Sequence, residues 1–290
     1  MPRSDTSDHV PGTVCLTMDV EPDYARTSSF AILDRAGPFF QWIHDEQVPV
    51  TAFVMGRLIA QSHPILDQLQ SAGAAVELHG YAHDVSGFGD MRSSHSEEIQ
   101  RGTEAYAKRF GRVPYGYRAP SGIVSADDIR LLDRLGFDYD SSIFPVRRTG
   151  RYDFRKLPRR PFRWEGLRLS EFPVALVTSR VPAGLTFTNL LGAGISATLM
   201  ARSAPIPAGP LVIDGHFHNI FPAPEALAGM PWPFRALYRM GELSGGLAGL
   251  MSLLNSLRRR GFALASLTEV ARTVSAGDLQ SVSLAFFDKS

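Results

Sequence analysis

Short apolar runs alternate with stretches of helical periodicity, and this alternation restricts the folds open to the chain. Strands and helices that alternate in this way favour a parallel sheet with helical crossovers, which is an α/β fold. The expected strands are residues 13–18, 48–56, 74–78, 115–118, 137–140 and 210–217, and the expected helices are residues 30–46, 63–73, 95–110 and 126–135.

Polar side chains follow the expected strands at the point where each apolar run ends. Asp19, His79, Arg118 and His218 each occupy such a position. In parallel α/β sheets the chemistry lies just beyond the carboxyl ends of the strands. The sequence therefore predicts that these four residues gather at one edge of the sheet and form a functional site.

Length and charge bound the class of protein. A chain of 290 residues fits a single domain spanning residues 1–290, such as one α/β barrel with insertions. Residues 145–170 are basic and irregular, and we expect them to form a solvated insertion. A formal net charge of +1 provides no global field that would favour nucleic acid or an anionic membrane.

A cytoplasmic location is expected. The single cysteine, Cys15, excludes an internal disulfide, and its apolar neighbours indicate a buried thiol. Residues 1–10 lack the apolar core of a secretory signal, and no run of about 18 apolar residues predicts a membrane span. Residues 183–208 and 228–255 are rich in apolar side chains, which fits either core helices or an apolar lip around a lipid-bearing substrate.

Two histidines four residues apart end the third expected strand, in the stretch AVELHGYAH. His79 and His83 can reach the same ion, and imidazole is a common ligand of zinc and related metals. The first strand ends in alternating carboxylates, Asp19, Glu21 and Asp23. One carboxylate can ligate a cation while another removes a proton from water. The pattern leaves open whether Glu21 or Asp23 is the ligand.

These motifs occur in the order found in a known family. The strand-end carboxylates, the H-x-x-x-H step and GYRAPSG are followed by GFDYDSSIFP, EFPV and GHFHN. In this order the chain resembles the polysaccharide deacetylase family, also called the NodB-homology family or carbohydrate esterase family 4. The resemblance implies a distorted (β/α) barrel of about seven parallel strands. It also implies metal-dependent hydrolysis of an N-acetyl or related amide on a sugar.

The resemblance assigns a metal site. Glu21, His79 and His83 match the metal ligands of the family, and a divalent ion is implied, zinc first, with Co²⁺, Ni²⁺ and Fe²⁺ as alternatives. Three protein ligands with open positions suit a catalytic metal of this kind. The chain departs from the usual adjacent aspartates, because it reads D-V-E-P-D at this point.

The resemblance also assigns catalytic roles. Asp19 matches the general base and Arg118 matches the arginine that orients it. The backbone N–H of Ser121 falls where the family donates to the oxyanion, and His218 matches the general acid. We expect His216 to point to the opposite face of the strand, because alternate strand residues face opposite ways, and either to serve packing or to support the residues of the site from behind.

The expected substrate is an N-acylated sugar linked to a nucleotide, a lipid or a small metabolite, and no nucleic-acid partner is expected. A competing interpretation is a metal-independent, allantoinase-like amidohydrolase of the same fold. Another is a carbohydrate-binding protein that keeps the barrel without turnover. Retention of both histidines and a nearby carboxylate argues against the first, and the intact set of candidate base, acid, arginine and ligands argues against the second.

Overall fold

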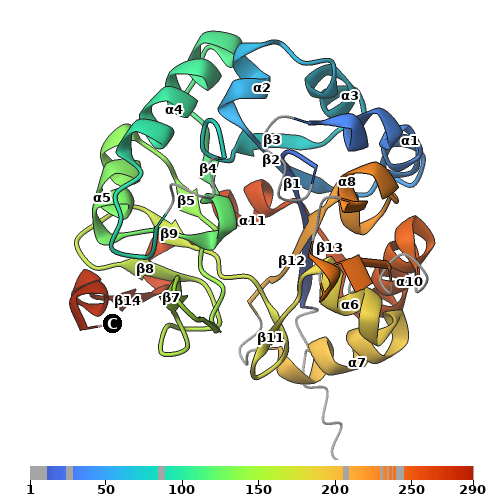
Figure 1. The fold of residues 1–290 in the computed structure, drawn as a ribbon. Coiled ribbons are helices and arrows are strands. Elements are labelled where there is room, and N and C mark those ends of the chain that lie inside the picture. Colours follow the sequence, from blue (N-terminus) through green and yellow to red (C-terminus); the bar gives the residue numbers. More distant parts are fainter. Residues whose placement is uncertain are drawn as a thin grey trace, which may run out of the picture.

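A mostly parallel sheet, surrounded by helices, organises the chain in the computed structural model (Figure 1). The structure describes residues 12–23, 29–83, 89–204, 209–228, 231–233, 235–236, 238–239 and 245–289. In spatial order the strands are β12 (Leu211–His216), β1 (Thr13–Val20), β2 (Val50–Val54), β3 (Ala75–Leu78), β4 (Gly116–Tyr117), β5 (Tyr139–Asp140), β9 (Ser170–Glu171), β8 (Phe162–Trp164) and β14 (Gln280–Val282).

Seven of these strands, from β12 through β9, pair in parallel with their neighbours. The sheet curves so that its two ends approach each other beyond β9. There, Val174 forms a parallel bridge with Val212, and the Ala175 N–H donates to the Val212 carbonyl over 2.9 Å. The expected α/β fold is confirmed. The ring closes on β12 through two isolated bridges, Val174–Val212 and Gly184–Asp214, whereas β12 and β1 are joined by a ladder.

The helices include the four that the periodicity predicted, together with others that it did not. The helices are α1 (Gly37–Asp45), α2 (Gly56–Ala60), α3 (Ile65–Ser71), α4 (Ser96–Phe110), α5 (Ala126–Leu135), α6 (Leu185–Leu191), α7 (Ala193–Ser203), α8 (Pro224–Ala228), α10 (Gly246–Arg258) and α11 (Leu267–Thr273). The helix expected at 30–46 is split into a 3₁₀ turn, Ala31–Arg35, and α1, because Pro38 has no N–H and is tolerated only in a first turn. The short helix α2 was not expected.

The basic stretch at 145–170 contains regular structure. Strands β6 (Arg147–Arg148) and β7 (Tyr152–Asp153) form an antiparallel hairpin. Strand β8 lies in the same stretch and pairs with β9 in the main sheet. The expectation that this stretch is irregular is therefore wrong, whereas its being an insertion and the single domain spanning 1–290 stay predictions. Residues 1–11 lie outside the described part of the chain.

Apolar side chains from both the strands and the helices fill the core. The β1 side chains Leu16 and Met18 are buried, and so is the thiol of Cys15, as the sequence predicted. Burial raises the pKa of that thiol well above its ordinary value. No helix among the described residues is long and apolar enough to cross a membrane.

Two glycines allow α4 to pack closely on α2. A Cβ on Gly102 would lie 2.8 Å from the backbone oxygen of Gly80, and a Cβ on Gly56 would lie 2.7 Å from the Gly102 Cα. The Gly56 N–H also donates to the Gly80 carbonyl over 2.9 Å. The loop that follows His79 therefore rests directly on these two helices.

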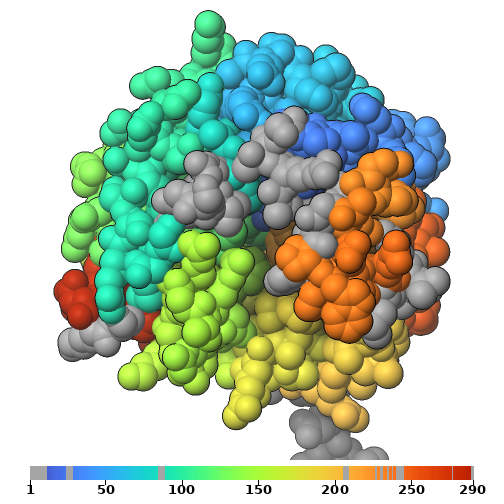
Figure 2. Space-filling model, viewed as in Figure 1, coloured from blue at the N-terminus to red at the C-terminus, as the bar shows by residue number. Residues whose placement is uncertain are grey.

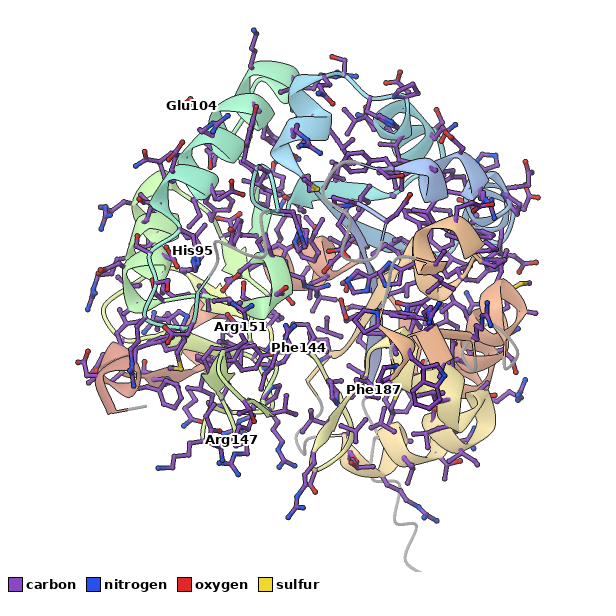
Figure 3. All side chains as sticks on the ribbon, viewed as in Figure 1. His95, Glu104, Phe144, Arg147, Arg151 and Phe187 are labelled. Atoms are coloured by element: carbon purple, nitrogen blue, oxygen red, sulfur yellow. The ribbon has the colours of Figure 1, made fainter. Side chains whose placement is uncertain are left out.

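We expect Gly102→Ala to lower the free energy of unfolding by about 1–3 kcal/mol, because the new methyl group would collide with backbone that cannot move freely. Urea denaturation measures this change. Glu104→Ala is the matched control, since Glu104 is exposed on the same helix (Figure 3) and its loss should cost no more than about 0.5 kcal/mol. Equal stabilities of the two variants would contradict the close approach.

Candidate functional site

The carboxyl ends of neighbouring strands bring the expected polar residues together. Asp19 lies at the end of β1, His79 follows β3, Arg118 follows β4 and His216 ends β12. All four are buried or nearly so. Figure 2 shows this side of the molecule hollowed near its centre, between the green, yellow and orange segments.

Glu21, His79 and His83 form the first cluster. The Glu21 Oε2 atom lies 2.6 Å from His83 Nε2 and 3.7 Å from His79 Nε2. The three ligand atoms lie within 4.8 Å of one another, a separation that one ion can span. Burial opposes the charged form of Glu21, but the neighbouring His83 and His216 lower its pKa well below the ordinary value.

The two imidazoles have the free nitrogens that a metal needs. The Nδ1 atom of His79 lies 2.9 Å from the carbonyl oxygen of Arg118, which can only accept, so this bond places the proton on Nδ1. Among the described residues, neither Nε2 makes a well-directed hydrogen bond, and both are buried. A carbonyl that fixes the tautomer is the usual support of a metal-ligating histidine. The donor set therefore fits a divalent ion.

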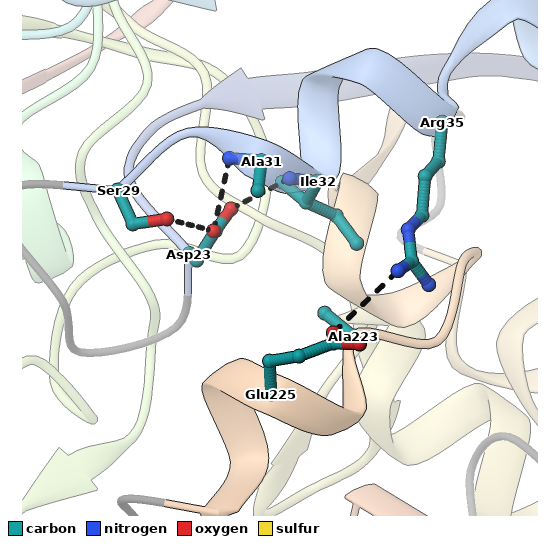
Figure 4. A pocket seen from close by; sticks show the side chains of 7 residues that line it. All are labelled: Asp23, Ser29, Ala31, Ile32, Arg35, Ala223 and Glu225. Carbon is teal, nitrogen blue, oxygen red and sulfur yellow. Dashed lines mark hydrogen bonds and ion pairs between the residues drawn. The ribbon is translucent and has the colours of Figure 1, made fainter.

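Asp23, the other candidate carboxylate, points away from the histidines. Its side chain accepts hydrogen bonds from Ser29 Oγ at 2.6 Å and from the N–H groups of Ala31 and Ile32 at 3.0 and 2.9 Å (Figure 4). These bonds occupy both carboxylate oxygens at the start of a 3₁₀ turn. Glu21 is therefore the carboxylate beside the histidines, and its role as the metal ligand stays a prediction.

A second cluster consists of Asp19, Asp214 and His216, and Arg118 links it to the first. Its Nη1 atom donates to Asp19 Oδ1 at 2.9 Å, to Asp214 Oδ1 at 3.2 Å and to Thr17 Oγ1 at 2.7 Å. Its other side contacts Ser141, through Nε to the carbonyl oxygen and through Nη2 to the hydroxyl, each at 3.0 Å. The guanidinium is fully buried. It holds the Asp19 carboxylate in one orientation, with Oδ2 3.8 Å from His79 Nε2.

The expectation for His216 is wrong. Its Nε2 lies 3.6 Å from Glu21 Oε1 and 3.8 Å from Asp19 Oδ2, so the ring faces the acidic cluster. Strand β12 ends at His216, and residues 217–219 form a 3₁₀ turn in which the alternation of a strand no longer applies. His218 consequently stacks on His216, with ring centroids 4.8 Å apart.

The two rings have opposite electrostatic environments. Burial opposes the charge on His216, but the carboxylates of Glu21, Asp214 and Asp19 raise its pKa to about 9. Burial, together with the charge of His216, lowers the pKa of His218 to about 3. The His218 ring also packs edge-on against Tyr238. At neutral pH His216 carries the proton, whereas His218 is neutral.

Ser121 lies in the turn that follows Arg118. Its φ of 58° is in the left-handed region, which a residue with a side chain seldom adopts outside constrained turns. The Ser121 carbonyl accepts a hydrogen bond from Arg148 Nη1 at 3.1 Å. Its proposed donation to an oxyanion stays a prediction.

Sequence reasoning missed a pair of buried acids beneath Arg118. Burial raises the pKa of Asp140 to about 6, and burial together with Asp140 raises that of Glu171 well above its ordinary value. Ser142 Oγ donates to Asp140 at 2.6 Å and accepts from the Ala119 N–H at 2.8 Å. The pair thereby supports the backbone that carries Arg118. Both acids lie in motifs that carry the family resemblance, FDYD and EFPV, but the sequence assigned neither acid a role.

Sequence reasoning also missed Glu98, on α4. Its Oε2 atom accepts the backbone N–H groups of Tyr81, Ala82 and His83, at 2.9, 2.8 and 3.3 Å. The loop needs this support because Gly80 and His83 both have positive φ, 61° and 56°. One carboxylate therefore fixes the backbone from which His83 projects. Nothing in the spacing links Glu98 to this loop.

Fold and site together define a class of α/β protein in which acidic and imidazole groups converge at the carboxyl edge of a parallel sheet. Within that class, residues 7–139 match the model of the family described as polysaccharide deacetylase. The chain is thus related to the polysaccharide deacetylases, and the resemblance seen in its motifs is confirmed.

A curated relative, the peptidoglycan deacetylase-like protein FGM2 of Gibberella zeae, is 30% identical over 94 residues. The match covers 32% of this chain and 28% of the relative, so it spans under a third of that protein's length.

Solved structures with the same fold are more distant in sequence. A putative polysaccharide deacetylase from Mycobacterium smegmatis has a TM-score of 0.56 at 22% identity, over 97% of this chain and 96% of that one. Puue allantoinase has a TM-score of 0.53 at 16% identity, over 90% and 89%. A pseudoenzyme of carbohydrate esterase family 4 from Bacillus anthracis, BA3943, has a TM-score of 0.50 at 13% identity, over 95% and 70%. At these identities the likeness concerns the fold alone.

We expect Glu98→Ala to weaken Zn²⁺ binding by roughly tenfold or more, because the backbone of the His83 loop loses its common acceptor. Competition with a chromogenic chelator measures the dissociation constant. Glu97→Ala, an exposed neighbour on the same helix, is the control. Glu98→Gln keeps an acceptor oxygen and should recover part of the affinity. An unchanged zinc affinity in folded Glu98→Ala would show that the His83 loop keeps its conformation without Glu98.

Proposed function

We propose that this protein is a metal-dependent hydrolase that removes an N-acetyl or related N-acyl group from a sugar or sugar conjugate. The observation that carries the proposal is the convergence of two buried imidazole nitrogens on Glu21, beside the Asp19–Arg118 pair. Amide hydrolysis needs an activated water, stabilisation of a tetrahedral oxyanion and a proton for the leaving amine. The site offers a group for each task.

Glu21, His79 and His83 would hold the metal, with zinc as the first choice. When bound, the ion supplies Lewis acidity for the amide carbonyl and lowers the pKa of water in the site. A carboxylate and two neutral imidazoles suit zinc as well as Co²⁺, Ni²⁺ and Fe²⁺. The His79 tautomer fixed by the Arg118 carbonyl supports this assignment.

Asp19 is the proposed general base. Its Oδ1 atom is held by Arg118, while Oδ2 faces the histidines and is free to take a proton from water. The paired guanidinium keeps the carboxylate oriented, as a base requires. The N–H of Ser121 is the proposed donor to the oxyanion.

His216 is the better candidate for the general acid, although the resemblance assigned that role to His218. His216 faces Asp19 and Glu21 and is protonated at neutral pH, whereas His218 stacks behind it and is neutral. Asp214, which Arg118 also binds, helps to keep His216 charged. We therefore assign proton donation to the leaving amine to His216, with His218 packing against its ring.

A second candidate is an amidohydrolase of the allantoinase kind. Puue allantoinase has this fold, and a likeness at 16% identity does not distinguish its substrate from a sugar. The metal-ligand set of this chain favours the deacetylase. The cytoplasmic location and the linkage of the sugar to a nucleotide, a lipid or a metabolite stay predictions.

Mass spectrometry of products released from a panel of N-acetylated sugar conjugates, with and without chelator, tests the function. We expect loss of one acetyl group, abolished by the chelator and restored by Zn²⁺. Asp19→Asn should keep the metal and lose at least about 100-fold in turnover, because only the base is removed. We expect about one metal ion per chain in the unaltered protein and none in the double variant His79→Ala/His83→Ala. Turnover that survives the chelator, or acts only on cyclic ureides such as allantoin, would favour the second candidate.

We expect His216→Ala to lower turnover by roughly 100-fold or more, because the amine must then leave without a proton. His218→Ala should have a smaller effect, mainly on the melting temperature, because it removes a packing contact. Turnover, metal content and thermal melting of both variants separate the two roles. Retained activity in His216→Ala, with loss in His218→Ala, would return the acid role to His218.

A further inference from the structure

Two arginines bracket the turn between β6 and β7. Arg148 ends β6, and Arg151 immediately precedes β7; the Arg151 N–H donates to the Arg148 carbonyl over 3.0 Å. Arg148 is exposed and Arg151 is half-buried. The turn therefore presents two guanidinium groups from one short segment.

Both guanidinium groups reach loops of the candidate site. Arg148 Nη1 donates to the carbonyl of Ser121, the residue proposed to stabilise the oxyanion. Arg151 Nη1 donates to the carbonyl of Gly89, and its own carbonyl accepts from the Met91 N–H at 2.9 Å. The β6–β7 turn thus contacts the Ser121 turn and borders the hollow in Figure 2, which we take as the entrance to the site.

Arg148 and Arg151 form no ion pair among the described residues, since neither lies within 4.0 Å of a carboxylate oxygen there. Arg155 on the same hairpin, in contrast, binds Asp153 through two nitrogens, at 2.7 and 2.5 Å. A guanidinium has five N–H donors, and one from each of Arg148 and Arg151 is used on a backbone oxygen. Donors therefore remain for a ligand in the entrance.

The opposite wall is apolar. A Cβ on Gly184 would lie 3.5 Å from Asp214 Oδ2 and 3.9 Å from the ring of Phe187, so that ring lies close to the second cluster. Phe187 is 38% exposed. Figure 3 shows Arg151 on the β6–β7 side and Phe187 on the α6 side of this face. The positive charge of the entrance is therefore on the hairpin side.

From this geometry we infer that Arg148 and Arg151 bind a phosphoryl group attached to the N-acylated sugar. Arginine suits phosphate because its planar N–H groups bond to two oxygens at once, and such charged bonds are stronger than neutral ones. A sugar with its amide at the Asp19 cluster would place an anionic substituent beside the hairpin. The inference rests on the proposed function for the orientation of the sugar and names the substrate class as a glycosyl phosphate or diphosphate.

Calorimetric binding, measured in the metal-loaded Asp19→Asn protein, tests the inference without turnover. We expect N-acetylglucosamine 1-phosphate to bind about tenfold or more tightly than N-acetylglucosamine. The preference should disappear in Arg148→Ala combined with Arg151→Ala and should weaken as salt is raised. Arg155→Ala is the matched control and should keep it.

Equal affinity for the two sugars, no detectable binding of the phosphorylated sugar, or an equal loss in Arg155→Ala would each overturn the inference. Because binding is measured directly, a protein that binds the phosphorylated sugar through these arginines yet hydrolyses no amide would contradict only the proposed function.

Kinetic arms with active protein then distinguish the source of the phosphoryl group. The two substrates are a uridine diphosphate sugar and a short-chain polyprenyl diphosphate sugar, both N-acetylated. Removing Arg151, which makes no bond to Ser121, should raise KM for each substrate and leave kcat within about twofold, since the contact is the same before and during reaction. An added loss in Phe187→Ser for the polyprenyl substrate alone would identify the lipid-linked form. A fall in kcat with unchanged KM would overturn a binding role for the arginines.

Discussion

The buried guanidinium of Arg118 makes the contacts on which the arrangement of the site depends. It bonds to Thr17 and Asp19 on β1, to Asp214 on β12 and to Ser141 after β5. Its Cζ atom also lies 4.4 Å from the ring centroid of Phe53 on β2. The backbone carbonyl of Arg118 fixes the tautomer of His79. A buried charge is stable only when its partners are in place, and losing one typically costs about 3–5 kcal/mol. The strand ends are thus held in register by the same group that orients the base.

The polar groups beneath and around Arg118 form successive layers. Asp140 and Glu171 support the backbone on one side, while Glu98 supports the loop of His83 on the other. None of these three acids is placed to touch a substrate. The fold shared with the Bacillus anthracis pseudoenzyme shows that the scaffold alone does not guarantee chemistry. In this chain, the proposed activity therefore depends on the particular residues that surround Arg118.

The strands and most helices could be predicted because periodicity and strand-end polar residues are local properties. Asp19, His79 and Arg118 were found by position alone, since parallel strands bring their carboxyl ends to one edge. Asp214 and Glu98 could not be found, because their partners are distant in sequence. His216 was misplaced for a different reason. The strand ends at that residue, and where a ladder stops depends on pairing with β1 rather than on the sequence GHFHN.

Two isolated parallel bridges, Val174–Val212 and Gly184–Asp214, close the ring of strands at a seam along the outer edge of β12. The junction of β12 with β1 carries a ladder of six residue pairs, so it is held more firmly than the seam. Strand β12 borders it and carries His216, while β1 on its other side carries Asp19. Breathing at the seam therefore changes the width of the ring on the side of β12 away from β1. The ladder between β12 and β1 keeps the proposed acid and base at a constant separation while the bridges on the other side of β12 open.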